Sequence, residues 1–156
     1  MHLTQKERML LEDQKKHEEM CIEKYGMAAA KASDPELKQL FATYQQQEQQ
    51  HLQTIQQILN GQIPQMQQGS QGGQQNQQQA SQGFSQASGQ PNQQDAFLCQ
   101  DLLSTEKYIS GTYDTAVFEF TNPQIRQALN HIQKEEQQHG EGIFNYMNQH
   151  GMYQPQ

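Results

Sequence analysis

The sequence is poor in apolar residues and has no tryptophan. Only 33% of its 156 residues are hydrophobic, and the mean hydropathy is -1.04. A chain of this length has room for one ordinary domain, so we expect residues 1–156 to form a single domain with a narrow core. No stretch approaches the roughly 18 apolar residues of a membrane span, and the first residues lack the apolar segment of a signal peptide. We therefore expect no membrane span, and synthesis and retention in the cytoplasm of a cell.

Basic residues and cysteines are also scarce. The chain has 10 Lys and Arg against 17 Asp and Glu, a formal net charge of -7 and a pI near 5.2. Because nucleic-acid binding requires clustered Lys and Arg, the sequence predicts no nucleic-acid partner and favours cations or basic partners. The two cysteines, Cys21 and Cys99, are too few for a disulfide scaffold and lack metal-site spacing, so we interpret both as small buried hydrophobic residues.

Charged residues are absent altogether from residues 61–94. This segment consists mainly of Gln, Gly, Ser and Asn, which cannot bury enough apolar surface to offset the entropy lost on ordering the chain. We interpret residues 61–94 as a flexible linker.

A helix-start signal interrupts each block that flanks the linker. Asp34-Pro35 and Asn122-Pro123 each combine a preferred N-cap residue with a proline suited to the first helical position. Each block is therefore expected to be a pair of helices joined by a short turn. The two expected hairpins cover residues 3–60 and 95–150.

The two blocks repeat each other when the first is shifted forward by 88 positions, which places His51 on His139. Apolar positions follow the same shift and recur at spacings of three and four, as in helices that face a bundle core. A helix of about 26 residues is roughly 40 Å long, so the linker can return along the bundle between the hairpins. One long crossover between two short-turn hairpins is the ferritin-like connection. The sequence predicts an all-α, ferritin-like four-helix bundle made of two duplicated hairpins and a long Gln/Gly-rich crossover; a simple up-down-up-down bundle would need no such loop.

Six polar residues interrupt the apolar positions at one expected height in the bundle. A Glu and a His three residues apart point from one helical face toward a common ion, and four ionised Glu with two neutral His balance two divalent cations. A Glu from each of two helices and Glu-x-x-His from the other two is the ligand set of ferritin-like di-iron and di-manganese proteins. We expect two divalent ions, iron or manganese. The expected metal ligands are Glu18, Glu48, His51, Glu106, Glu136 and His139.

Two other interpretations of these residues stay open. The Glu and His residues could lie on solvated faces by coincidence, or they could form a buried hydrogen-bonded network without metal. No Lys or Arg occupies the apolar face of any expected helix, so four central carboxylates would have to bind protons or metal.

Further residues near the expected site allow two readings each. Tyr25 and Tyr113 are candidate hydrogen-bond partners of the ligands or simple core residues. Gly140 and Gly142 permit a bulge or a close approach beside His139, or are tolerated helix defects. The side chain of Glu135 is expected to point into solvent.

The second block resembles the spore coat protein F (coat F) domain family of endospore-forming Firmicutes. The resemblance covers about 60 residues, and its most specific parts are Asp101-Leu102-Leu103-x-x-Glu106-Lys107, Asn122-Pro123 and Gly151-Met152-Tyr153. It implies a ferritin-like fold, a location in or near the spore coat after synthesis in the mother cell, and other spore coat proteins as partners. In such a coat the glutamines of the linker would be accessible to Gln-Lys crosslinking; the alternative is a solvated linker without a partner.

Two functions are compatible with these observations. The first is a structural spore coat component with a buried two-metal carboxylate site. The second is a di-iron or di-manganese redox enzyme, a peroxidase or ferroxidase, that protects the spore. The resemblance does not establish enzymatic activity, and the sequence leaves a homo-oligomer open; nothing in it favours the closed shell of subunits that iron storage needs.

Overall fold

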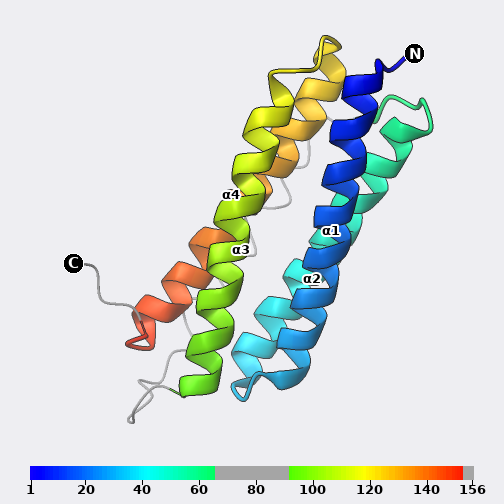
Figure 1. Ribbon diagram of the computed structural model, residues 1–156. Coiled ribbons are helices and arrows are strands. Elements are labelled where there is room, and N and C mark those ends of the chain that lie inside the picture. The colour runs from blue at the N-terminus through cyan, green and yellow to red at the C-terminus, as the bar shows by residue number, and fades with distance from the viewer. Residues whose placement is uncertain (66–91, 153–156) are drawn as a thin grey trace.

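The structure is a bundle of four helices (Figure 1). It is a computed structural model that describes residues 1–65 and 92–152. The helices are α1 (Gln5–Lys31), α2 (Pro35–Leu59), α3 (Gln93–Val117) and α4 (Pro123–Gln149). No strand occurs among the described residues, so the expected all-α four-helix bundle is confirmed. None of these helices is long and apolar enough to cross a membrane.

Each helix begins at a polar side chain that caps its free backbone N–H groups. Asp34 accepts from the backbone N–H of residue 36 at 3.1 Å, and Asn122 accepts from that of residue 124 at 2.8 Å. Both expected N-caps are therefore confirmed, as is proline at the start of α2 and α4. In α1, Thr4 and Glu7 cap each other reciprocally.

The helix α3 begins two residues earlier than expected. Asn92 accepts a hydrogen bond from the backbone N–H of Asp95 at 3.0 Å, so Gln93 and Gln94 belong to the helix and not to the linker. The uncharged composition of the segment concealed this cap. Residues 66–91, with the crosslinking expected for their glutamines, lie outside the described residues.

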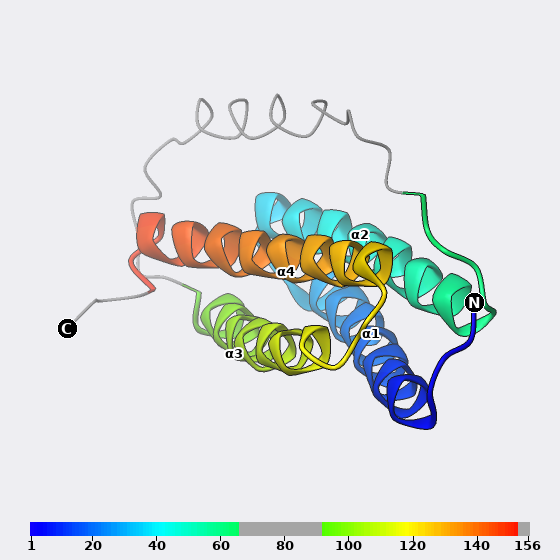
Figure 2. The ribbon, with the colours of Figure 1, turned by 90° about the horizontal axis from the view of Figure 1, so that it is seen from above.

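The helices pair as two hairpins that pack side by side (Figure 2). The helix α1 packs against α2 and α3, and α4 packs against α3 and α2. Two helices, α1 and α4, run in one direction, whereas α2 and α3 run in the other (Figure 1). The end of α2 and the start of α3 therefore lie at opposite ends of the bundle.

The core consists of two apolar clusters with a polar layer between them. One cluster includes Leu11, Ile58, Phe120 and Ile125, near the start of α1. The other includes Phe41 and lies around the turn between α1 and α2. Both cysteines are buried and free, as expected. Each apolar cluster includes residues of all four helices, so packing on either side fixes the position of the polar layer.

Two buried acids tie the start of one hairpin to the turn of the other. Asp95 accepts hydrogen bonds from the backbone N–H groups of Ser33 and Asp34 at 2.8 and 3.1 Å. Glu7, which occupies the equivalent position in the other hairpin, accepts from the backbone N–H of Thr121 at 3.5 Å. These contacts set the height at which the two hairpins meet.

Candidate metal centre

The polar layer contains all six ligands expected from the sequence. Every one of these side chains is buried, and none has an exposed fraction above 2%. Every helix contributes to this layer. Glu18 lies on α1, Glu106 lies on α3, and one Glu-x-x-His pair lies on each of α2 and α4. The spacing of three residues places Glu and His on one face of the helix. The fold therefore brings all six residues together in the centre of the bundle.

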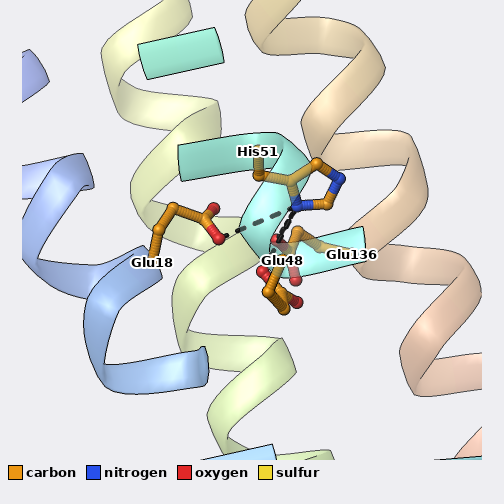
Figure 3. A group of neighbouring side chains, drawn as sticks. All are labelled: Glu18, Glu48, His51 and Glu136. Atoms are coloured by element: carbon orange, nitrogen blue, oxygen red, sulfur yellow. Dashed lines mark hydrogen bonds and ion pairs between the residues drawn. The ribbon is translucent and has the colours of Figure 1, made fainter. Parts of the chain in front are cut away.

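The first group of ligands surrounds His51 (Figure 3). Its Nδ1 atom lies 2.9 Å from Glu136 Oε1, 3.2 Å from Glu48 Oε2 and 3.7 Å from Glu18 Oε2. Figure 3 shows these three carboxylates grouped around the ring of His51; Glu18 comes from α1, Glu48 from α2 and Glu136 from α4.

The second group surrounds His139 in the same manner. Its Nδ1 atom lies 3.0 Å from Glu48 Oε1, 3.5 Å from Glu106 Oε1 and 3.7 Å from Glu136 Oε2. The two imidazole rings lie nearly parallel, with centroids 6.0 Å apart.

Glu48 and Glu136 belong to both groups, and each directs one carboxylate oxygen toward either histidine. In each group, one atom from each of three Glu and one His lies within 4.8 Å of the others. Carboxylates that share oxygens between two positions are suited to bridging a pair of cations, with His as a terminal ligand. The two groups could therefore hold two metal ions side by side.

The outward-facing nitrogen of each histidine contacts a residue that precedes a shared glutamate. His51 Nε2 lies 3.2 Å from Glu135 Oε1, and His139 Nε2 lies 2.5 Å from Gln47 Oε1. A neutral His that offers Nδ1 to a metal keeps its proton on Nε2, and both outer acceptors suit that tautomer. They therefore fix the orientation of both rings.

The expectation that Glu135 is solvated was wrong. Its side chain is 22% exposed and also lies 2.7 Å from His131 Nε2. The helical face of Glu135 is oriented away from the core of its own hairpin, but the opposite hairpin brings His51 to it. The 88-residue shift relates Gln47 to Glu135 and is the signal that could have identified the pair.

Two tyrosines form hydrogen bonds with candidate ligands of the opposite hairpin. Tyr25 donates to Glu106 Oε1 at 2.6 Å, and Tyr113 donates to Glu18 Oε1 at 2.5 Å. Burial and the neighbouring carboxylates raise the pKa of both phenols well above its ordinary value, so both remain donors. Of the two readings that the sequence left open, the hydrogen-bonding one is confirmed.

Three carboxylate oxygens in the layer have no hydrogen-bond partner although they are buried. They are Oε2 of Glu18, Glu106 and Glu136. The charged partners of the layer among the described residues are histidines, with no Lys or Arg. Buried polar atoms without partners are rare and costly in folded proteins, so the layer fits cations that would use these oxygens.

The pKa values of two carboxyl groups in the layer are raised, as expected for a site that holds protons when metal is absent. Burial and the neighbouring Glu48 carboxylate raise the pKa of Glu18 to about 8, and burial also raises the pKa of Glu136. Burial disfavours ionised Glu48, but the interactions with Glu18 and the two histidines outweigh it and lower its pKa. Burial disfavours charged His51, but the carboxylates around it raise its pKa. Bound protons thus offset part of the carboxylate charge.

The two glycines of α4 have different surroundings. A Cβ atom at Gly142 would overlap the hydroxyl of Tyr44, whose ring stacks on His139 with centroids 4.2 Å apart. The close approach considered for this position is therefore confirmed. At Gly140, where α4 continues without a bulge, a Cβ atom would meet Leu103 and Glu106 only at ordinary contact distances of 3.7 and 3.9 Å.

A pocket of about 470 Å³ lies between α3 and α4 and reaches the second group of ligands. Its lining includes Glu106 and Glu136. The two side chains are 2% and 0% exposed, so they separate the pocket from the interior of the layer.

Comparison with known proteins gives one result that bears on this site. Residues 94–156 match the family model of the Coat F domain. Neither the curated proteins nor the solved structures give a match to the chain. The matched region contains α3 from its second residue on, α4, and the candidate ligands Glu106, Glu136 and His139. The match supports the coat F resemblance seen in the sequence, over the second hairpin of the chain.

Proposed function

We propose that this protein is a ferritin-like component of the spore coat whose bundle binds two divalent ions, iron or manganese, in its core. The observation that carries the metal site is the sharing of Glu48 and Glu136 between two ligand groups, each completed by one further Glu and one His. Four carboxylates match the charge of two divalent cations. In this proposal residues 1–156 form one domain, synthesised in the mother cell, in which two duplicated hairpins are joined by a long crossover.

The Coat F match over residues 94–156 supports the location and a structural role among other coat proteins. Within that role, the metal ions would stabilise the bundle. They would supply positive charge to a layer of buried carboxylates that has no Lys or Arg partner among the described residues. A ligand that binds only the folded state stabilises that state by mass action.

Metal analysis tests the proposal directly. The protein is purified without chelator, loaded with Mn²⁺ and analysed for bound metal, and its thermal unfolding is compared before and after chelation. We expect two ions per chain, and a higher unfolding temperature with metal than without. Glu48→Ala and Glu136→Ala should bind neither ion. Retention of no metal by the wild type, with an unfolding temperature that Mn²⁺ does not change, would leave a metal-free buried network as the correct reading.

A redox enzyme is the alternative function, and the pocket that reaches Glu106 and Glu136 favours it. When bound, an iron or manganese pair supplies one electron per ion, which suits the two-electron reduction of hydrogen peroxide. The chain would hold the pair, and Glu135 and Gln47 would keep both imidazoles oriented. Peroxide consumption by the iron-loaded protein, absent in Glu48→Ala, would support the enzyme; metal binding without consumption would leave the structural role.

A further inference from the structure

The pocket between α3 and α4 has the charge expected of a passage for cations. Besides Glu106 and Glu136, its lining includes Glu141 and Lys107. Glu106 and Glu141 outnumber the one ammonium even when Glu136 holds a proton, so the pocket keeps an excess of negative charge. A concave acidic surface raises the local concentration of cations. Two of the lining carboxylates, Glu106 and Glu136, are themselves candidate ligands, so the pocket lies directly beside the centre.

Gly140 leaves space in the wall of this pocket. The Cβ direction at this position faces Leu103 and Glu106, two residues of the pocket wall, with no contact below 3.7 Å. The helix therefore accepts a Cβ atom at this position, and a larger side chain would extend from it toward the pocket wall. Glycine weakens a helix interior, and at this position it leaves space beside the pocket wall.

The other hairpin has a different residue at the corresponding place. The 88-residue shift relates Gly140 to Leu52 on α2, which is partly buried. It also relates Lys107 to Glu19. The two groups therefore have the same kinds of candidate ligand, but the residues near the pocket at Gly140 differ from those at the corresponding place in the other hairpin.

We propose that divalent cations enter and leave the metal centre through the pocket at Gly140, by way of the ligand group of Glu106, Glu136 and His139. A cation then reaches the group of Glu18 and His51 through the shared carboxylates Glu48 and Glu136. This inference rests on the proposed metal binding and adds to it the route and its direction.

Closing the pocket tests the route with Co²⁺ as the probe. In Gly140→Leu, stopped-flow absorbance should show that Co²⁺ association and release both slow by about tenfold. The dissociation constant and the two ions per chain should stay unchanged, because a barrier in a passage acts equally on entry and exit. Gly111→Leu is the matched control, since position 111 is exposed on α3 and a Cβ atom there meets nothing within 4 Å.

Charge reversal at the rim gives a second test with little risk to folding. Lys107→Glu should speed Co²⁺ association at low ionic strength, and the gain should disappear in high salt. Lys16→Glu, on the exposed side of α1, changes the net charge equally and should leave the rate as in the wild type.

The outcomes separate the route from the metal centre. Unchanged rates in both Gly140→Leu and Lys107→Glu, with normal binding of Co²⁺, would overturn the route and leave the centre intact. A wild-type protein that takes up no Co²⁺ would overturn the centre and the route together.

Discussion

Tyr25 on α1 donates a hydrogen bond of 2.6 Å to Oε1 of Glu106 on α3. Tyr113 on α3 returns the same contact to Glu18 on α1 at 2.5 Å. Each hairpin thus positions a ligand of the other. Because the tyrosines use only one oxygen of each carboxylate, the second oxygen, Oε2, stays available within the layer.

Removing one of these hydroxyl groups should weaken metal binding. In Tyr25→Phe the ring still fills the core, but Glu106 loses the donor that orients it, so we expect the affinity for Mn²⁺ to fall by about tenfold. The free energy of unfolding of the metal-free protein should fall by about 1–3 kcal/mol, because a buried acceptor loses its partner. Titration calorimetry and urea denaturation measure the two effects. Tyr108→Phe, at a side chain 61% exposed, is the control; an unchanged affinity in Tyr25→Phe would reduce Tyr25 to a core residue.

Substituting a glutamate that both groups share should release more metal ions than substituting one that belongs to a single group. Glu18 contributes only to the group of His51, whereas Glu48 contributes to both groups. We expect Glu18→Gln to retain one ion per chain and Glu48→Gln to retain none, as measured by elemental analysis after dialysis. Equal loss in both variants would contradict the division of the layer into two overlapping groups.

Metal affinity should depend on pH between about 6 and 8. The metal-free protein holds protons on Glu18, whose pKa is raised to about 8, and on Glu136, whose pKa is also raised. A cation must displace these protons, so the affinity should fall as the pH falls, by up to about tenfold per pH unit for each proton released. Calorimetry in two buffers with different ionisation enthalpies counts the protons. A dissociation constant that does not change from pH 8 to pH 6 would show that neither carboxyl is protonated without metal.

The contact between Asp95 and the first turn should contribute strongly to stability. Asp95 is 2% exposed and accepts from two backbone N–H groups, so Asp95→Ala should lower the free energy of unfolding by about 2 kcal/mol. Asp101→Ala, on the same helix, removes only a partly exposed ion pair with Lys24 and should cost less than about 1 kcal/mol. Chemical denaturation of both variants measures the difference, and equal losses would show that the Asp95 contacts add nothing specific.

The sequence by itself determined the four helices, the N-caps Asp34 and Asn122 of α2 and α4, and the six residues of the polar layer. Capping depends on contacts within one turn, as at Asp34 and Asn122, and burial follows the spacing of apolar positions along one helix. Both kinds of information are local. The 88-residue shift added that Glu18 and Glu106 occupy equivalent places, which led to the expectation of a common layer.

Only the tertiary structure decided which groups face each other within that layer. The sharing of Glu48 and Glu136, the contact of Glu135 with His51 and the donation from Tyr25 to Glu106 all cross from one hairpin to the other. Such contacts depend on how far the hairpins are rotated and shifted relative to each other, and this is set by the packing of the two apolar clusters. For the same reason the position of Gly140 beside the pocket is visible only in the tertiary structure. The pocket lies between α3 and α4, and its lining includes Gly140 and the candidate ligands Glu106 and Glu136.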